Sequence, residues 1–357
     1  MSLRVAMLAH SDAPWTPLYG AALQERGHVI KIGSFHEAKL AGLDCEFLGT
    51  RPFLPGRNRT DYLWGVRRAA RLLRSFRPDV VFAPFLSSNG LVACLAWRGP
   101  VVVSACGSDV LAARTWAQRQ VVARVCARAV CVHAVSENLV DALVDQQVPR
   151  DKIECFPVGV DPDRFASPGV GGQREGHILG GRKHDAVYQN DVIVAALGVL
   201  RDRGREVRGT LLGGGPLLEE RRAQVSSLGL EGRVLLPGHV EHERIPEYLA
   251  SAAIYVSASR SDGASASLLE AMASGCFTVV AGIRANEYWI DSGRTGLLFD
   301  VGDPVSLANA LEKALDDDEL RREAATLNRA RVVREAKHSE MMDRLDGLLR
   351  AVALKAP

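Results

Sequence analysis

Short apolar runs alternate with amphipathic segments along most of the 357 residues. The β-prone runs lie at residues 3–8, 29–33, 80–83, 101–104, 129–135, 209–212, 234–236, 253–256 and 278–281. Helical periodicity occupies the intervals, at residues 61–76, 90–97, 112–127, 137–146, 191–200, 219–228, 245–251 and 304–315. Strands that alternate with helices build βαβ units, so the pattern predicts parallel sheets with helices on both faces.

The alternation breaks in the Gly/Pro-rich segment between Val158 and Gly181, which predicts an interdomain linker. We therefore expect an N-terminal domain at 1–158, a linker at 159–181, a C-terminal domain at 182–320 and a helical tail at 321–357. With 47% hydrophobic residues, the chain can bury two cores of ordinary size. Two doubly wound α/β domains place a ligand between them, at the carboxyl ends of their strands.

The segment from Ser257 to Cys276 carries the most specific chemistry. A strand ends at the turn Ser261-Asp262-Gly263, and Ser265 or Ser267 caps the helix that follows. A helix N-terminus offers free N–H groups and a positive dipole end, which together hold a diphosphate without a metal. Glu270 can accept hydrogen bonds from a ribose diol, and Asp262 can face the sugar beyond the diphosphate. The alternative is an ordinary crossover whose two carboxylates are solvated.

This segment resembles the E-x7-E signature of glycosyltransferase family 4, in the variant S-D-G-x-S-x-S-L-L-E-A-M-A. Further matches follow in the family's order at Gly213-Gly-Gly-Pro216, Leu236-Pro-Gly-His239, Asn286-Glu-Tyr-Trp289 and 296–303, and upstream at 135–138 and 156–165. The resemblance covers nearly the whole chain. It implies the GT-B fold, in which two doubly wound Rossmann-like domains face a central cleft, and a retaining enzyme that uses a nucleotide sugar. It also implies that the helical tail at 321–357 crosses back onto the N-terminal domain.

The resemblance also implies a donor site in the second domain. Arg182 would bind the diphosphate through its planar guanidinium, and Tyr188 stands where the family usually has a lysine. Asp262 and Arg182 are the expected catalytic residues of this domain. The nucleotide would contact Gly213, Gly214, Gly238, His239, Ser265, Ala266, Ser267, Leu268, Glu270 and Tyr188. The alternatives are that Arg182 is an ordinary surface arginine, that the glycines at 213–215 form a simple turn and that His239 is a surface histidine.

On the acceptor side, the loop Ser104–Asp109 resembles the S-A-W-G-S-D loop of the family. Cys106 stands where many members have a histidine, and a thiol replaces an imidazole near neutral pH only if its pKa is shifted. A catalytic general-base role then passes to Asp109 or to the departing phosphate. Asp109 equally fits a cap for the helix at Val110. His133 also ends a strand, but a core histidine explains it better.

The formal net charge of +2 is divided unevenly. Residues 1–158 carry 19 basic and 13 acidic side chains, a net +6, which leaves 25 basic and 29 acidic, a net −4, for the rest. The helix expected at 61–76 carries Arg67, Arg68, Arg71 and Arg74 beside an apolar face. This pattern predicts either a solvated surface or a weak contact with anionic lipid or an acidic acceptor.

No apolar run approaches the roughly 18 to 20 residues of a membrane span, and the N-terminus enters a strand without a signal-peptide pattern. We therefore expect a cytoplasmic protein that is at most peripheral at the inner membrane. The seven cysteines form no C-x-x-C pair, and we expect them to be buried rather than to bind metal. No nucleic-acid partner is expected, and the oligomeric state is open.

Together these features predict transfer of a sugar from a nucleotide diphosphate sugar to a hydroxyl, with UDP as the expected nucleotide. The acceptor would be a small natural product, a lipid-linked sugar or a polysaccharide. The donor is a substrate, so no cofactor and no metal are expected. Two alternatives are a GT-B epimerase that needs no acceptor and a nucleotide-sugar-binding pseudoenzyme. The pseudoenzyme is suggested by three departures from the family pattern. Asp262 is one methylene shorter than the glutamate of the signature, Tyr188 replaces a lysine and Cys106 replaces a histidine.

Overall fold

The computed structural model describes residues 1–37, 40–49, 61–113, 115–165 and 176–355. The chain divides into two compact units, and each is described by itself. Unit 1 comprises Met1–Val158 and His338–Pro357, and unit 2 comprises Gly159–Lys337.

Unit 1 is built on a seven-stranded sheet with the strand order β3-β2-β1-β4-β5-β6-β7. Every neighbouring pair of strands is parallel. The strands are β1 (Arg4–Leu8), β2 (Val29–Ser34), β3 (Cys45–Phe47), β4 (Val80–Pro84), β5 (Val101–Ala105), β6 (Cys131–Ala134) and β7 (Ile153–Cys155). The order changes direction between β1 and β4, which makes their carboxyl ends a topological switch point.

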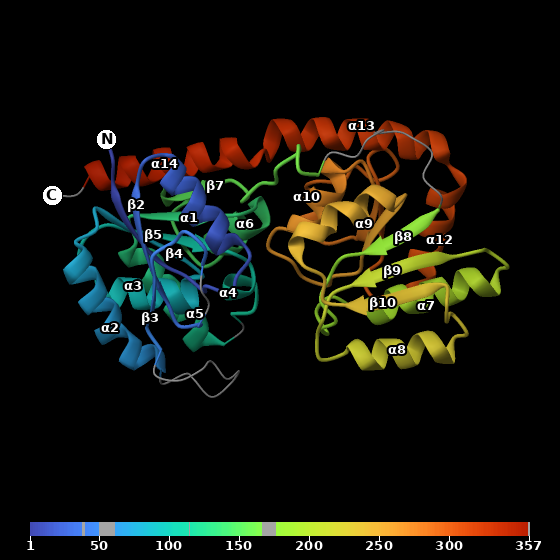
Figure 1. Cartoon of the computed structure of the whole chain (residues 1–357), viewed down its shortest axis with the longest axis horizontal. Helices are drawn as coiled ribbons and strands as arrows, with labels where there is room; N and C mark the ends of the chain where they lie inside the picture. Colours follow the sequence, from blue (N-terminus) through green and yellow to red (C-terminus); the bar gives the residue numbers. More distant parts are fainter. Residues whose placement is uncertain (38–39, 50–60, 114, 166–175, 356–357) are drawn as a thin grey trace. The chain divides into compact units, whose positions relative to one another are not determined.

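Helices cover both faces of this sheet (Figure 1). On one face Met7, Phe82 and Val102 belong to a core shared with α1 and α14. The opposite face packs against α2 and α5, and α3 lies against both of these helices. The helices of unit 1 are α1 (Trp15–Glu25), α2 (Asp61–Phe76), α3 (Leu91–Ala96), α4 (Ser108–Leu111), α5 (Trp116–Arg128), α6 (Glu137–Val144) and α14 (His338–Leu354), with short turns at Leu86–Gly90 and Arg150–Lys152.

Unit 2 repeats the plan with a six-stranded sheet in the order β10-β9-β8-β11-β12-β13. Its neighbouring strands are all parallel. The strands are β8 (His177–Gly180), β9 (Arg208–Leu212), β10 (Val234–Gly238), β11 (Ile254–Ser257), β12 (Phe277–Ala281) and β13 (Leu297–Phe299). The switch point of this sheet lies between β8 and β11.

Two layers of helices enclose the second sheet, with α9 and α10 on the side away from α7 and α8 in Figure 1. One core joins the sheet to α7 and α12, and another joins it to α9, α10 and α13. The helices are α7 (Asn190–Asp202), α8 (Leu218–Ser227), α9 (Ile245–Ser251), α10 (Ala266–Ala273), α11 (Arg284–Glu287), α12 (Pro304–Asp316) and α13 (Asp318–Glu335), with a short turn at His242–Arg244. The two doubly wound sheets confirm the predicted fold class.

The strands β3, β7 and β13 lie outside the β-prone runs identified in the sequence, and three further segments differ from the expected pattern. The range 159–181, predicted as a linker, contains β8 at the switch point of the second sheet. Four residues are too few to show the periodicity of a strand, and the neighbouring glycines favour a loop, so the sequence pattern did not predict β8. The helix expected at 112–127 begins only at Trp116, after Thr115 forms a capping box with Gln118. The expected tail is two helices, because α13 ends before Ala336 and α14 begins at His338.

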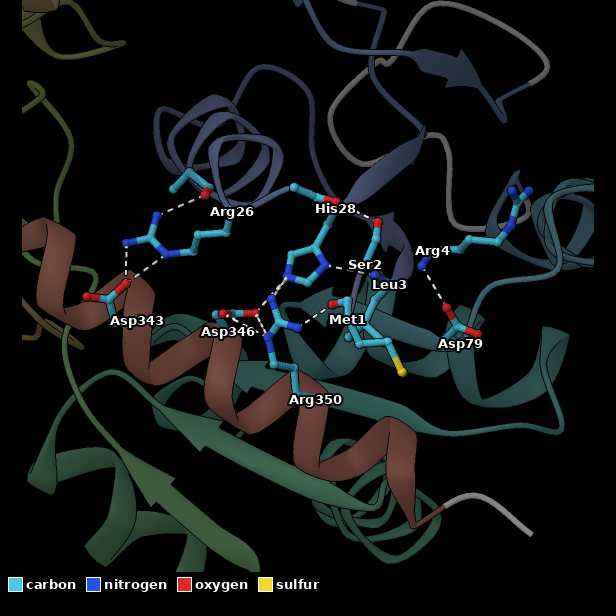
Figure 2. Close-up of polar contacts among 12 residues, drawn as sticks. Met1, Ser2, Leu3, Arg4, Arg26, His28, Asp79, Asp343, Asp346 and Arg350 are labelled. Carbon is cyan, nitrogen blue, oxygen red and sulfur yellow. Dashed lines mark hydrogen bonds and ion pairs between the residues drawn. The ribbon is translucent and has the colours of Figure 1, made fainter.

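Helix α14 is held to the rest of unit 1 by a partly buried polar network (Figure 2). His28 Nδ1 accepts a hydrogen bond from the backbone N–H of Leu3 at 3.0 Å, and His28 Nε2 lies 2.6 Å from Asp346 Oδ1. Arg350 donates from Nε to both oxygens of Asp346, at 2.8 and 3.0 Å, and from Nη1 to the carbonyl of Met1. Burial alone would raise the pKa of Asp346, but the hydrogen bonds from His28 and Arg350 hold it below its usual range.

We predict that Asp346→Ala lowers the free energy of unfolding by roughly 1 to 3 kcal/mol, because the fully buried His28 side chain loses its partner. Asp343→Ala is the matched control on the same helix, since Asp343 is 70% exposed and pairs with Arg26 at the surface. It should cost less than about 0.5 kcal/mol. Guanidinium denaturation measures both changes.

The pKa of Asp346 is lowered in the folded state, so its stabilisation is present above the unfolded carboxyl pKa and is lost as pH falls through the folded value. The difference between wild type and Asp346→Ala should therefore shrink below about pH 4. Equal effects of the Asp343 and Asp346 substitutions would contradict this account of the network.

Candidate functional site

The switch point of unit 2 brings two segments of the predicted site together. Arg182 follows β8 by two residues, and the loop 258–265 follows β11. Strands β8 and β11 are hydrogen-bonded neighbours that end at the same edge of the sheet. Ligands of doubly wound sheets bind at such an edge, where the connections leave on opposite faces. The sheet order therefore places Arg182 beside the Ser/Gly loop that carries Asp262.

Arg182 is the centre of this edge. Its Nη2 lies 2.7 Å from Asp262 Oδ2, and the two side chains are 14% and 13% exposed. Its Nη1 donates to the hydroxyls of Ser265 and Ser267 at 3.3 and 3.2 Å. The guanidinium also lies over the ring of Tyr188, 4.3 Å from the ring centroid. One cation thus joins the loop after β8, the loop after β11 and the start of α10.

The charge of Arg182 is secured by its neighbours. Burial alone would lower the pKa of the guanidinium, but the Asp262 carboxylate and the phenols of Tyr255 and Tyr188 raise it. Burial raises the pKa of Tyr255 to about 12, so this phenol stays protonated and donates to Ser267 Oγ at 2.7 Å. The site therefore presents one fixed cation in a poorly solvated setting, where electrostatic interactions are strong.

Helix α10 begins at this cation. Ser265 is its N-cap, and the Ser265 hydroxyl accepts from the backbone N–H of Leu268 at 3.3 Å, which confirms the first of the two predicted caps. The first-turn N–H groups of Ala266 and Ser267 have no intrahelical partner in an α-helix. Together with the dipole they favour an anion beside Arg182. This is the arrangement expected of a diphosphate site.

The glycine loop after β9 packs directly on the Arg182 segment. Gly213 has φ +113°, and a Cβ there would lie 2.6 Å from the carbonyl oxygen of Arg182. A Cβ on Gly215 would lie 2.3 Å from the carbonyl oxygen of His184. The N–H of Gly213 donates to the carbonyl of Gly238 at 2.8 Å, which ties the loop to the end of β10. Glycine is therefore required here by close backbone approach.

The turn after β10 completes this edge. Gly214 lies beside His239, since a Cβ on Gly214 would be 3.6 Å from the His239 Cβ. The His239 side chain is 72% exposed and lies 3.5 Å from the similarly exposed carboxylate of Glu241. His239 therefore has a surface position next to the glycine loop, where an exposed ring is free to contact a ligand.

Glu270 has a partner that the sequence did not indicate. Its Oε1 accepts from His242 Nε2 at 2.8 Å. Glu270 is 8% exposed in the second turn of α10, whereas the His242 side chain is 40% exposed. The two residues are 28 positions apart, and their contact depends on how the turn His242–Arg244 packs against α10. No local spacing rule links such a pair.

A second polar cluster lies at the switch point of unit 1, between β1 and β4. His10 follows β1, and its ring lies 4.6 Å from that of His36 and 5.3 Å from that of Phe85, measured between centroids. His36 Nδ1 lies 2.8 Å from Asp12 Oδ2. Burial and then the charge of His36 lower the pKa of His10 to about 4, although Asp12 opposes this. His10 is therefore neutral near pH 7.

The backbone of unit 1 is strained at the same place. Phe85 has φ +68°, a conformation that non-glycine residues rarely adopt, and a π-helical turn follows at Leu86–Gly90. Asp109 holds this strained segment by accepting from the N–H of Leu86 at 2.8 Å. It also accepts from Cys106 and Gly107, at 3.1 and 2.8 Å. Backbone strain of this kind gathers at functional sites.

These contacts correct one expectation for Asp109. The N-cap of α4 is Gly107 without a side-chain cap, so Asp109 does not cap the helix at Val110. Its pKa is raised by burial, although the three backbone N–H groups oppose the shift. Burial and then the Asp109 charge raise the pKa of the Cys106 thiol to about 12. The thiol is therefore protonated near neutral pH and does not act as a base.

His133 has the position of a core histidine. It is fully buried, with Nδ1 2.9 Å from Ser104 Oγ and Nε2 2.8 Å from the carbonyl oxygen of Phe156. Burial lowers its pKa to about 4. Both ring nitrogens are engaged within the fold, as expected of a core histidine.

The basic helix α2 has the predicted bounds and buries Ala69 and Leu73. Its exposed stripe consists of Trp64, Arg67, Arg71 and Arg74, and Arg67 lies over the Trp64 ring. Arg68 differs from the expectation, because it donates to the carbonyls of Leu48 and Gly49 and is half-buried. Within the described part of the chain, no helix has the length and apolarity to cross a membrane.

Comparison with solved structures identifies the fold. Structurally, the chain is similar to Anabaena HepE solved with UDP and glucose, with a TM-score of 0.82 and 17% identity over 98% of this chain and 99% of that one. This likeness establishes the GT-B fold.

Two family models match the chain in succession. The model for Glycosyltransferase Family 4 matches residues 19–164, and the model for Glycosyl transferases group 1 matches residues 183–331. The chain belongs to glycosyltransferase family 4.

Two curated relatives each match about half of this chain. The α-D-kanosaminyltransferase of Streptomyces kanamyceticus is 29% identical over 45% of this chain and 42% of its own length. The GDP-mannose-dependent α-(1-6)-phosphatidylinositol monomannoside mannosyltransferase of Mycolicibacterium smegmatis is 32% identical over 47% of this chain and 48% of its own length. The matched region thus spans about half the length of these relatives.

The contacts of Asp109 generate a prediction that separates support of the fold from catalysis. Asp109→Ala should lower the free energy of unfolding by roughly 2 to 4 kcal/mol, because two buried N–H groups and one partly buried N–H group lose their acceptor. Thermal denaturation measures the loss, with the exposed Asp151→Ala as the control in the same unit. A slower enzyme of unchanged melting temperature would contradict this account and favour Asp109 as a base.

Proposed function

We propose that this chain is a retaining glycosyltransferase that moves a sugar from a nucleotide diphosphate sugar to a hydroxyl group. The observation that carries the proposal is the position of Arg182 at the switch point of unit 2. There it contacts Asp262 and both serines at the start of α10. A fixed cation and a helix N-terminus at one point suit a diphosphate that gains negative charge as it leaves.

In this proposal the diphosphate lies against Arg182 and the first turn of α10. The Asp262 carboxylate keeps the guanidinium charged and oriented before the donor arrives. Tyr188, which replaces the usual lysine of the family, supports the cation through its ring and adds no second charge. Arg182 and the helix dipole then provide most of the stabilisation of the leaving group, and no metal is required.

The nucleoside extends from the diphosphate along the glycine loop. The backbone at Gly213 and Gly214 permits close approach, Gly238 and His239 contact the base, and Glu270 accepts from the ribose hydroxyls. UDP is the proposed nucleotide, supported by the UDP in the structure of Anabaena HepE. The name of the Mycolicibacterium relative specifies GDP-mannose, so GDP is the competing choice.

Asp262 is the proposed contact of the donor sugar. A carboxylate near the anomeric carbon stabilises positive charge as the sugar flattens, and this interaction is stronger in the transition state than in the ground state. We propose no covalent intermediate. The acceptor hydroxyl attacks from the face that the phosphate leaves, and the departing phosphate takes its proton.

The acceptor is proposed to be a hydroxylated molecule handled by unit 1. The polar cluster of His10, Asp12 and His36 at the switch point of that sheet supports this assignment. The name of the Mycolicibacterium relative, a phosphatidylinositol monomannoside mannosyltransferase, fits a lipid-linked sugar. A small natural product is the second class of acceptor. A polysaccharide is the third possible class.

One specific observation favours a pseudoenzyme as the second candidate. The Cys106 thiol has a pKa of about 12, raised by burial, where many relatives carry an imidazole, so this side chain does not serve as a base. A pseudoenzyme would bind nucleotide sugar without turnover. Hydrolysis of the donor by purified wild type separates the two, because slow water attack accompanies a competent transferase site. An epimerase would instead interconvert the donor sugar without an acceptor.

The proposal predicts different defects for the two carboxylates. Glu270→Ala should weaken UDP binding by about 1 to 3 kcal/mol, because the ribose hydroxyls lose a charged acceptor. Asp262→Asn should leave UDP affinity almost unchanged, because the amide oxygen still accepts from Arg182, and Ser265 and Ser267 still orient the guanidinium. It should lower turnover by roughly 10² to 10³, because the charge of the carboxylate acts chiefly in the transition state. Calorimetric titration with UDP and product mass spectrometry provide the two readouts. Unchanged UDP affinity in Glu270→Ala removes the ribose assignment, and wild-type turnover in Asp262→Asn removes the sugar contact.

The exposed stripe of α2 supports a weak contact with anionic membranes. Arg67, Arg71 and Arg74 should each contribute about 1 kcal/mol of affinity for vesicles that contain phosphatidylserine, and the binding should fade with salt. Co-sedimentation of wild type and the triple glutamine variant measures the effect, with the exposed Arg124→Gln on α5 as control. Absence of binding at low salt would show that the stripe is solvated surface and that the protein is not peripheral at the membrane.

A further inference from the structure

The partner of Glu270 suggests how the nucleotide site is set in position. His242 lies in the short turn before α9, and its Nε2 is 2.8 Å from Glu270 Oε1. A carboxylate oxygen accepts hydrogen bonds, so Nε2 carries the proton in this pair. Among the described residues, no hydrogen bond reaches the second carboxylate oxygen, Oε2. The imidazole therefore orients the carboxylate and leaves one oxygen for a further donor.

His242 is itself held by the first residues of unit 2. Arg164 Nη2 donates to the His242 carbonyl at 3.0 Å, and the ring of Phe165 lies 6.0 Å from the His242 ring. The hydrogen bond fixes the backbone of the turn, and the ring contact limits the rotation of the imidazole. His242 thus reaches Glu270 from a supported position rather than from a free loop.

The same segment supports the other end of α10. Arg329 of α13 donates to the carbonyl of Pro162 at 2.9 Å and to the carbonyl of Ala273, the last residue of α10, at 2.7 Å. The N–H of Val160 donates to the carbonyl of Ala336 at 2.9 Å. Residues 160–165 are therefore linked to α10 at two points. Arg329 connects them to the last residue of the helix, and His242 connects them to Glu270.

We propose that His242 is a positioning residue that holds Oε1 of Glu270 so that Oε2 accepts from the ribose diol of a nucleoside diphosphate. This inference rests on the proposed function, in which Glu270 binds the ribose. A carboxylate that is already oriented loses less conformational freedom when the ribose binds. The hydrogen bond to the ribose therefore contributes more to the binding affinity. The half-exposed imidazole also remains beside the ribose and contributes to the choice between ribose and deoxyribose.

The test uses UDP and 2′-deoxy-UDP as probes, with GDP and 2′-deoxy-GDP in parallel, in calorimetric titrations of the full chain. His242→Phe keeps a ring against Phe165 and removes the donor, whereas His242→Gln restores an N–H within reach of Glu270. We expect His242→Phe to weaken UDP binding by about tenfold, and His242→Gln to recover most of the affinity. The matched control is Glu243→Gln, which changes an exposed carboxylate in the same turn.

Discrimination between the two nucleotides separates positioning from mere folding. Wild type should prefer UDP over 2′-deoxy-UDP by about tenfold, and His242→Phe should reduce this preference to about twofold. Glu270→Ala should abolish the preference, and the double variant Glu270→Ala/His242→Phe should bind no more weakly than Glu270→Ala alone. A general loss of structure would instead lower both affinities together and lower the melting temperature.

The outcomes distinguish the inference from the function on which it rests. If Glu270→Ala weakens UDP binding but His242→Phe binds UDP as tightly as wild type, or more tightly, the positioning role is overturned and the ribose assignment stands. If Glu270→Ala binds UDP unchanged, both are overturned. Additive effects in the double variant would also overturn the inference, because the two residues would then act independently.

Discussion

The ion pair between Arg182 and Asp262 is the interaction on which the rest of the site depends. It joins the segments after β8 and β11, and these strands are neighbours only because the strand order of unit 2 changes direction there. The surrounding backbone is arranged to hold this pair. Asn190 donates to the carbonyls of Arg182 and Lys183, at 3.3 and 3.0 Å, and Gly213 lacks the side chain that would collide with Arg182. A poorly solvated cation needs such support, since an unpaired charge would be expensive to bury.

Unit 1 has a corresponding constraint at the switch point of its own sheet. The strained backbone at Phe85 persists because Asp109 accepts from Leu86 on one side and from Cys106 and Gly107 on the other. In unit 2 a carboxylate holds a cation, whereas in unit 1 a carboxylate holds backbone N–H groups. The same residue type thus has two different uses, which are distinguished by what it contacts rather than by its position after a strand.

The sequence predicted the parts of this protein that follow local rules. The bounds of α2 and the Ser265 cap come from short-range periodicity and capping, and the structure confirms them. The roles assigned to Arg182, Asp262 and Glu270 stay predictions, although the fold brings Arg182 and Asp262 into contact. What the sequence could not predict depends on distant packing. Strand β8 is too short to show a period, and the pairing of His242 with Glu270 exists only after the turn before α9 packs on α10.

The central claim is that unit 2 binds a nucleoside diphosphate between Arg182 and Glu270. The most direct test is a crystal structure of the full chain with UDP bound. The account predicts that the diphosphate oxygens lie within hydrogen-bond distance of the Arg182 guanidinium and the first-turn N–H groups of α10, and that the ribose hydroxyls donate to Glu270. A diphosphate bound elsewhere, with the Arg182 and Asp262 pair untouched by the ligand, would contradict it.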